Sequence, residues 1–251
     1  MTGNPADHYA TFDFPLNVYA RALEIENGAV HSLHYGFWSD DTPDLTSAQR
    51  AATELLWKHL PPAPARVLEV GIGLGSTAGA LIDAGYAYAG VVPDADQIAF
   101  CRAALAPREP HFLCSKFEDL DDEPQVDLIL FQESAQYVPP AELLATCCRL
   151  LRPGGSVLIF DEMSAAVANA LGRTLFASGL RLDEEFDVTE RAAPSVRYLH
   201  ETIEKHRQQL LEELGITESL LDGFQEVLRG RERAYAEGRY YYRMLRLLRV
   251  D

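Results

Sequence analysis

Short apolar segments alternate with amphipathic ones through the middle of the chain. The apolar segments consist of aliphatic, β-branched and aromatic residues, which suit strands that are covered on both faces. Between them, apolar residues recur at helical spacing, for example at Ile98, Cys101 and Leu105. This alternation of strand and helix predicts a parallel, doubly wound sheet. The five strand segments are residues 66–70, 86–92, 111–114, 126–131 and 156–160.

The two ends of the chain follow a different pattern. Residues 1–61 carry apolar positions at helical spacing and end in a proline-rich stretch, which is typical of a helical cap ahead of a core domain. Residues 180–188 suit a sixth strand, and the charged segment 195–236 carries a helical apolar stripe. The tyrosine-rich segment after Gly238 suits either a helix with an arginine face or a strand, and we favour the strand.

The predicted fold class is therefore α/β, with a doubly wound, mainly parallel, seven-stranded Rossmann-like sheet. A chain of 251 residues is long enough for one large domain of this kind with helical additions. The predicted parts are an N-terminal helical cap (1–61), a core (62–194), a helical insertion (195–236) and a final core strand (237–251).

A glycine-rich turn follows the first strand directly. Glycines stand at Gly71, Gly73 and Gly75, with Glu69 two residues before the first of them. A strand, a glycine turn and a helix N-terminus allow bare backbone to approach a ligand and to present N–H groups to it. A dinucleotide-binding fingerprint would need its third glycine at position 76, where this chain has Ser76.

Charge and cysteine content indicate which partners, compartment and metal ligands to expect. Lys and Arg number 22 against 38 Asp and Glu, so the formal net charge is −16. Such a surface repels phosphate backbones and anionic lipid, which argues against nucleic acid and membrane partners. No apolar run approaches the roughly 20 residues that span a bilayer, and the first residues lack the regions of a signal peptide. We expect a cytoplasmic protein whose four cysteines are reduced and hold no metal.

Five stretches of the chain share the order and spacing of one family. They resemble the motifs of class I S-adenosylmethionine (SAM) dependent methyltransferases across roughly residues 60–250. The aromatic segment 34–38 is similar to the N-terminal cap of small-molecule methyltransferases, among them sugar and natural-product O-methyltransferases and the cyclopropane fatty-acid synthase branch. The five stretches are residues 67–75, 89–97, 117–120, 126–134 and 150–155.

The resemblance implies that SAM is the cofactor and S-adenosylhomocysteine (SAH) the product. In the family, the glycine turn lines the methionine part, and the acidic residue before it binds the amine. Gln97 would bind the ribose, with Asp94 as second choice, because the usual acidic residue is replaced by Val92. A second departure is Lys116, at another usually acidic position. The implied cofactor-binding residues are Tyr35, Glu69, Gly71, Gly73, Gly75, Gln97, Phe117, Glu118, Gln132 and Ser134.

The methyl acceptor needs a group that orients it or takes its proton. Asp161 is our first candidate, because we expect it just after the fifth strand, at the edge where open α/β sheets bind ligands. It could instead cap the following helix. His34 is the second candidate, and it could instead be a packed residue of the cap. A catechol-type metal site would use Glu133, Asp161 and Glu162, but the family's full ligand pattern is missing, so no metal is predicted.

The sequence therefore predicts methyl transfer from SAM to a small-molecule acceptor, at a hydroxyl of a secondary metabolite. An alternative is a cyclase or dehydratase of the same fold that uses the pocket without transferring methyl. A third reading is a non-catalytic protein that binds a partner through its helices. The helical insertion 195–236 would form the roof over the acceptor, or its apolar stripe would form a homodimer face.

Overall fold

The computed structural model describes residue 9 and residues 11–121 and 125–250. The chain divides into two compact units. Unit 1 combines Met1–Ala51 with Glu190–Gly238, and unit 2 combines Ala52–Thr189 with Arg239–Asp251. The N-terminal cap and most of the helical insertion thus belong to one unit, although about 140 residues separate them in the sequence.

Unit 2 is built on a seven-stranded sheet in the order β3-β2-β1-β4-β5-β7-β6. All neighbouring strands are parallel except β7, which runs antiparallel to both β5 and β6. This confirms the predicted fold class, including a strand in the tyrosine-rich C-terminal segment. The strands are β1 (Arg66–Val70), β2 (Ala87–Val92), β3 (His111–Cys114), β4 (Val126–Gln132), β5 (Leu151–Ser164), β6 (Leu180–Asp187) and β7 (Tyr240–Arg249).

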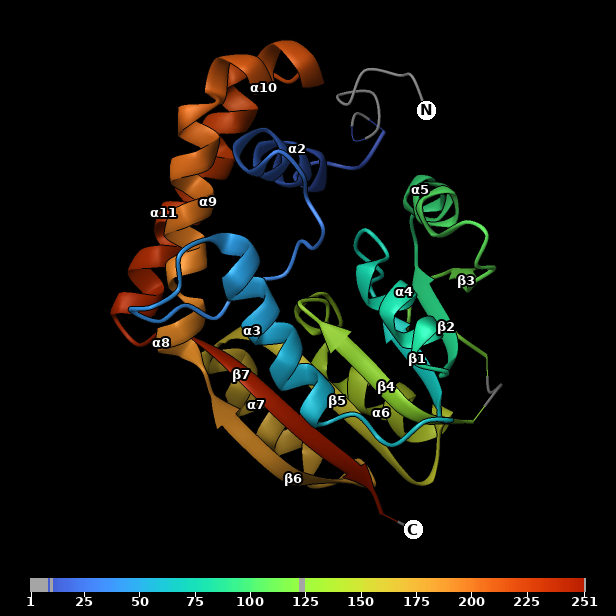
Figure 1. Ribbon diagram of the computed structural model, residues 1–251. Helices are drawn as coiled ribbons and strands as arrows, with labels where there is room; N and C mark the ends of the chain where they lie inside the picture. The colour runs from blue at the N-terminus through green and yellow to red at the C-terminus, as the bar shows by residue number, and fades with distance from the viewer. Residues whose placement is uncertain (1–8, 10, 122–124, 251) are drawn as a thin grey trace. The chain divides into compact units, whose positions relative to one another are not determined.

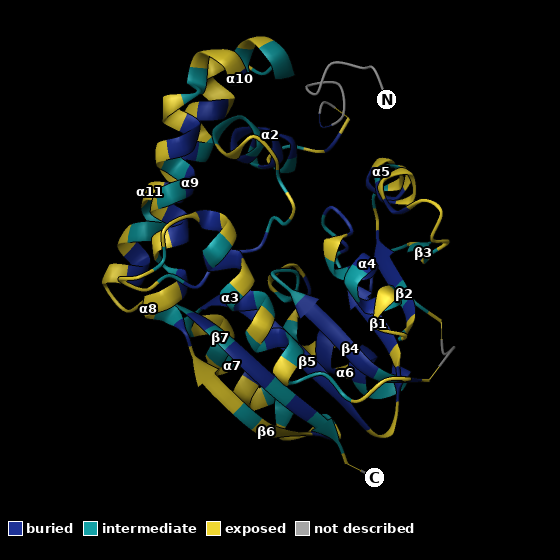
Figure 2. Ribbon diagram, viewed as in Figure 1, coloured by how far each residue is buried: buried dark blue, intermediate teal, exposed yellow. Residues whose placement is uncertain are grey.

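Helices cover both faces of this sheet (Figure 1). Helix α4 (Ser76–Asp83) lies in front of the sheet in this view, and α6 (Pro140–Leu150) and α7 (Ala165–Leu175) lie behind it. Helix α5 (Ala95–Leu105) follows β2 and contacts β2 and β3. The central strands are nearly continuous runs of buried aliphatic residues, as in other sheets covered on both faces. Figure 2 shows β4 largely buried and β7 a mixture of buried and intermediate residues, whereas the edge strand β6 is largely exposed.

Strand β5 is longer than its apolar segment predicts. We expected residues 156–160, but the strand runs from Leu151 to Ser164. Its extension past Phe160 pairs with β7, as far as Ser164 opposite Tyr240. Asp161 and Glu162 therefore lie within the strand, not after it. The following helix is capped by the Ser164 hydroxyl, which accepts from the N–H of Val167, so the reading of Asp161 as a helix cap is wrong.

The regular elements of unit 1, among its described residues, are helices. Helix α2 (Leu16–Asn27) ends at Gly28, whose φ is 75°, in the left-handed region typical of a helix end. Helix α3 (Leu45–Lys58) begins in unit 1 and ends in unit 2, and α8 (Thr189–Ala192) crosses the second boundary. The predicted insertion forms α9 (Pro194–Lys205), α10 (Arg207–Leu214) and α11 (Glu218–Ala236).

The apolar stripe of the insertion is mostly used within unit 1. Helix α9 packs against α2 and α11, and buried side chains from all three insertion helices form the interior. Leu220 and Val227 remain exposed on α11. The buried stripe consists of Leu199, Ile203, Leu210, Leu221 and Leu228.

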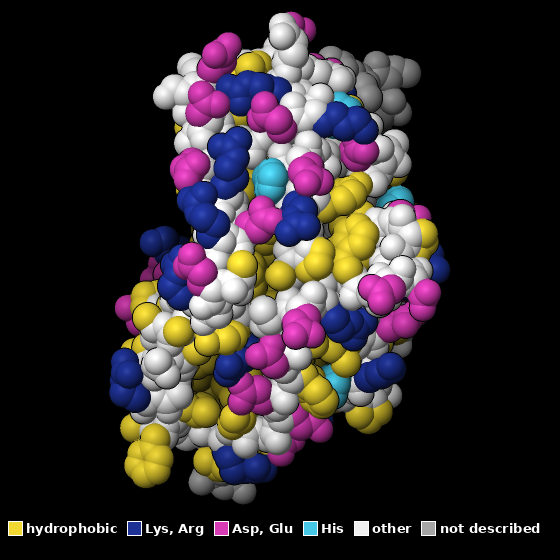
Figure 3. All heavy atoms as spheres, turned by 90° about the vertical axis from the view of Figure 1, so that its left-hand side faces the viewer, with side chains coloured by type: hydrophobic (Ala, Val, Ile, Leu, Met, Phe, Trp, Pro, Cys, Tyr) yellow, Lys and Arg dark blue, Asp and Glu magenta, His cyan; other side chains and the backbone are white. Residues whose placement is uncertain are grey.

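The surface is charged. Figure 3 shows acidic and basic side chains interleaved on one face of the molecule. Among the described helices, none is long and apolar enough to cross a membrane.

Candidate cofactor and acceptor site

The glycine turn (residues 71–75) connects β1 to α4 in a conformation that requires glycine. Gly71 and Gly73 have φ values of 78° and 51°, in the left-handed region. A Cβ atom on Gly71 would lie 2.7 Å from Cβ of Ser134, so the turn packs tightly against the loop after β4. A Cβ atom on Gly73 would meet nothing within 4 Å, so the backbone there borders open space. The turn thus offers bare backbone to a ligand at Gly73.

Glu69 lies in β1 beneath this turn and is buried, with 2% of its surface exposed. Its Oε2 accepts a hydrogen bond from the hydroxyl of Tyr88 in β2. Burial raises the pKa of Glu69 from 4.5 to about 7, although the Tyr88 hydrogen bond opposes that rise. At neutral pH this carboxyl is therefore close to the midpoint of its titration. An incoming cation would favour its charged form.

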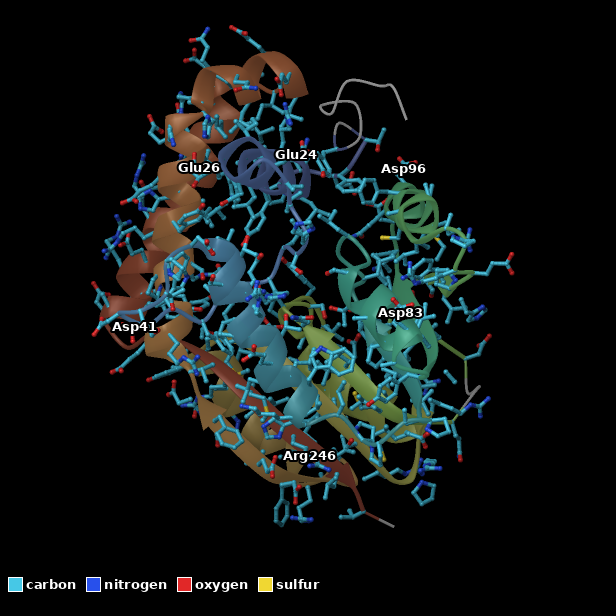
Figure 4. The ribbon with its side chains drawn as sticks, viewed as in Figure 1. Glu24, Glu26, Asp41, Asp83, Asp96 and Arg246 are labelled. Carbon is cyan, nitrogen blue, oxygen red and sulfur yellow. The ribbon has the colours of Figure 1, made fainter. Side chains whose placement is uncertain are left out.

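Helix α5 supports the turn from the β2 side. Its N-cap is Asp94, whose Oδ1 accepts from the N–H groups of Asp96 (2.9 Å) and Gln97 (3.0 Å); Figure 4 labels Asp96 in this first turn. The Gln97 side chain donates from Nε2 to the carbonyl oxygen of Gly73 at 2.8 Å. Gln97 thus fixes the turn directly, while Asp94 serves as a helix cap.

Four further implied cofactor-binding residues lie after β3 and at the end of β4: Phe117, Glu118, Gln132 and Ser134. Phe117 is buried in the core, and its ring meets that of Phe131 edge to face at 5.1 Å. Glu118, next to it, is partly exposed. Gln132 accepts at Oε1 from the hydroxyl of Thr77 (3.0 Å), and the Ser134 hydroxyl donates to the carbonyl oxygen of Val70. Gln132 and Ser134 therefore tie the end of β4 to β1 and α4.

Asp161 lies in β5 with 0% of its surface exposed. Its Oδ2 accepts from the backbone N–H of Gln136 (3.0 Å) and its Oδ1 from the Gln136 side-chain amide (3.1 Å). Both carboxylate oxygens thus hold the 3-10 turn η1 (Ala135–Tyr137) that follows β4. A small hollow beside Asp161 has mainly apolar walls, including Leu143 and Val167. This arrangement suits a positioning role better than proton transfer.

Glu133 is the residue in this region with a strained backbone. Its φ is 59°, the one positive value outside glycine among the described residues. Its N–H donates to the carbonyl oxygen of Phe160 (2.8 Å), and its Oε1 accepts from the hydroxyl of Tyr242 (2.9 Å) in β7. Glu133 is partly exposed, whereas Tyr242 is buried. The chain therefore holds one partly exposed carboxylate in a fixed place at the end of β4.

The comparisons with known proteins agree with this geometry. Residues 68–159 match the family model of the methyltransferase domain. An uncharacterized methyltransferase of Mycobacterium bovis is 34% identical over 96 residues, which cover 38% of this chain and 39% of that protein. Over residues 68–159 the chain is similar to the methyltransferase domain. The predicted resemblance is thereby confirmed. The curated match spans only about two fifths of either chain.

Solved structures extend the fold of the methyltransferase domain to almost the whole chain. The cyclase SpnF has a TM-score of 0.76 at 19% identity and covers 93% of both chains. A mycolic acid cyclopropane synthase complexed with SAH and CTAB has a TM-score of 0.77 at 14% identity, over 96% of this chain and 93% of that one. At these identities the likeness establishes a shared fold.

Two predicted site residues, His34 and Tyr35, lie outside the methyltransferase domain in unit 1. Both are buried, and Nδ1 of His34 bonds to the carbonyl oxygen of Tyr35 at 2.9 Å. Burial lowers the pKa of His34. The segment is also anchored by the hydroxyl of Ser195, which accepts from the N–H of Gly36 (3.0 Å) and from Nε1 of Trp38 (2.9 Å). His34 and Tyr35 are thus part of a well-packed segment within unit 1.

The structure does not bring the three candidate metal ligands together as a metal site. Among the described residues, no group of three His, Cys, Asp or Glu side chains could hold a metal ion. This includes Glu133, Asp161 and Glu162.

Sequence reasoning did not identify three residues that lie next to the carboxylates Glu69 and Glu133: Tyr88, Gly90 and Tyr242. A tyrosine and a glycine inside an apolar strand were available signals, because a strand glycine marks a close approach.

Proposed function

We propose that the chain is a SAM-dependent methyltransferase that acts on a small-molecule acceptor, at a hydroxyl of a secondary metabolite. The observation that carries this proposal is the glycine turn, open over Gly73 and placed above the buried Glu69. SAM presents a carboxylate and an amine at one end. N–H donors and a carboxylate acceptor within one turn complement that pair.

Different residues of the chain would bind the amino-acid end, the ribose and the adenine of SAM. Backbone at residues 71–75 would hold the amino-acid end, and Glu69 would accept from the amine. Gln97 would bind the ribose through its amide oxygen, since its nitrogen donates to Gly73. Phe117 and Glu118 would border the adenine. When bound, SAM supplies an electrophilic methyl group on a sulfonium.

Glu133 is the carboxylate that we assign to the acceptor. It is partly exposed, its backbone is strained, and the Tyr242 hydroxyl fixes its orientation. Strain of this kind persists at functional sites because the surrounding structure imposes it. Glu133 would accept the proton of the acceptor hydroxyl, a contribution of about 10²–10⁴-fold for a well-placed base. Asp161 would act indirectly by fixing Gln136 in the neighbouring turn.

His34 is a second candidate base. Its Nδ1 bonds to a backbone carbonyl oxygen, so the ring carries its proton there and Nε2 is the basic nitrogen. Burial lowers the pKa of His34, which favours the neutral imidazole and makes it a weaker base.

A cyclase or dehydratase of the same fold is the alternative. Two observations favour it: the chain shares its fold with the cyclase SpnF over 93% of its length, and the first predicted base, Asp161, is fully buried and hydrogen-bonded. In that case the site would orient and polarise a substrate without moving a methyl group.

The decisive experiment uses SAM labelled in its methyl group and a panel of small hydroxyl-bearing acceptors. Label recovered in an acceptor ether supports methyl transfer to oxygen. An acceptor that is cyclised or dehydrated without label supports the alternative. No saturable binding of SAM or SAH would remove the methyltransferase proposal.

Two variants locate the base. We expect Glu133→Gln to lower transfer by about 10²-fold or more, while SAH binding stays unchanged. Glu142→Gln is the matched control, because Glu142 is an exposed carboxylate in the first turn of α6. Equal rates for the two variants would exclude Glu133 as the base.

A further inference from the structure

A buried acid–phenol pair lies beneath the glycine turn, in a space that a glycine leaves for it. The Tyr88 hydroxyl donates to Glu69, and the Tyr88 ring packs edge to face on Phe112. Gly90 is opposite Glu69 in the pairing of β1 with β2. A Cβ atom on Gly90 would lie 2.6 Å from the Tyr88 hydroxyl oxygen, too close for any real contact. Gly90 therefore makes room for this hydrogen bond.

We propose that Tyr88 is a positioning residue for the cofactor: its hydroxyl, admitted by Gly90, holds one oxygen of the Glu69 carboxylate and leaves the other for the amine of SAM. This inference rests on the proposed function, since it concerns how the same site recognises its cofactor. A phenol donor suits the task, because it stabilises the carboxylate without bringing a positive charge that would repel the amine.

The surroundings of Glu69 contain few other groups that could set its charge. Leu130 of β4 lies opposite it and is apolar, and the glycine turn contributes backbone and apolar side chains only. From α5, the Cys101 thiol donates to the carbonyl oxygen of Gly73 at 3.5 Å; burial and the charges of Glu69 and Asp94 raise the pKa of this thiol to about 12. Cys101 is therefore neutral at physiological pH, and Tyr88 is the donor that favours the ionised form of Glu69.

A pH dependence follows from this arrangement. The pKa of Glu69 is about 7, so its ionised fraction, and with it the affinity for an amine-bearing ligand, rises as the pH passes through 7. Removing the Tyr88 hydroxyl raises the pKa of Glu69 further, because no hydrogen bond then opposes the effect of burial. The rise in affinity therefore occurs at higher pH.

The test is calorimetric titration of the full chain with SAH between pH 6 and 9, for the wild type and Tyr88→Phe. We expect the rise in SAH affinity to occur about one pH unit higher in the variant than in the wild type. Compared with the wild type, the variant then binds SAH about ninefold more weakly at pH 6, about fivefold more weakly at pH 7 and equally at pH 9. The amine of SAH titrates identically in both experiments, so the ratio of dissociation constants isolates the protein group.

Two further variants separate positioning from loss of structure. Tyr86→Phe is the matched control, because it also removes a tyrosyl hydroxyl that donates to an acceptor, the carbonyl oxygen of Pro61 (2.7 Å), away from Glu69. Its curve should coincide with that of the wild type. Glu69→Gln should bind weakly without the rise through pH 7, and adding Tyr88→Phe to it should have no further effect.

The outcomes are distinct. Coincident wild-type and Tyr88→Phe curves, or a loss by the same factor at every pH, overturn the inference while SAH binding by the wild type upholds the proposed function. No binding by the wild type at any pH overturns the proposed function and this inference with it. If Tyr88→Phe fails to fold, Gly90→Ala displaces the same hydroxyl and should shift the rise in the same direction.

Discussion

Two buried carboxyl groups at the same sheet, Glu69 in β1 and Asp161 in β5, show two different uses of an acid. Glu69 has a single side-chain donor, Tyr88, and its pKa is raised to about 7. Asp161 accepts hydrogen bonds at both oxygens, from the backbone and the side chain of Gln136. A carboxylate with two fixed donors holds structure, whereas one left close to its titration midpoint can respond to a ligand.

The segments around the two acids differ in the same way. The glycine turn beside Glu69 is formed by neighbouring residues, with bare backbone against open space at Gly73. The region around Asp161 is formed by pairing between β5 and β7, which are about 80 residues apart in the sequence. The first is therefore a local structure suited to a cofactor. The second depends on long-range pairing and places side chains for the acceptor.

The largest expected effect is on the glycine turn. Gly71→Ala should destabilise the chain by about 4 kcal/mol, because it combines left-handed strain with overpacking. The clash is with Ser134, at 2.7 Å, so adding Ser134→Gly should restore about half of the loss. Urea denaturation of the two single variants and the double variant measures this. Additive losses would contradict the close packing of the turn.

Glu69→Gln tests the use of the first acid and should stabilise the chain at high pH. The folded pKa of Glu69, about 7, is above its ordinary value of 4.5, so folding favours the neutral form. That stability is present below pH 4.5 and is lost as the pH rises through 7. The variant lacks this loss. Its free energy of unfolding should therefore be nearly equal to that of the wild type at pH 4 and about 3 kcal/mol larger at pH 8. Denaturation curves across this range would show it, and a difference independent of pH would contradict the assigned cause.

Asp161→Asn should have the opposite effect on stability, and a smaller one. The amide keeps one acceptor but turns an NH₂ group toward a donor of Gln136, which costs about 2 kcal/mol. Gln136→Ala removes only the side-chain donor and should cost about 1 kcal/mol. Denaturation at pH 7 gives both values. If Asp161→Asn were neutral for stability but abolished transfer, Asp161 would be a catalytic base.

The sequence predicts the local structures of the molecule better than those formed by long-range strand pairing. The strand–turn–helix around Gly71–Gly75 and the doubly wound, mainly parallel sheet were predictable, because periodicity and glycine spacing are local. The length of β5 was not, because its last residues are strand only through pairing with β7. The expectation that Asp161 follows the fifth strand was wrong for that reason. The Glu133–Tyr242 and Glu69–Tyr88 contacts were likewise hidden, because each joins side chains from different strands.

The central claim is that the open backbone at Gly73 holds the amino-acid end of SAM. The most direct test is calorimetric titration with SAH of the wild type, Gly73→Ala and Gly85→Ala. Both glycines have positive φ, 51° and 87°, and a Cβ atom on either meets nothing within 4 Å, so both variants bear similar strain. Only Gly73 belongs to the glycine turn. We predict saturable binding by the wild type and Gly85→Ala and a loss of about tenfold or more in Gly73→Ala; equal affinities for all three proteins would contradict the claim.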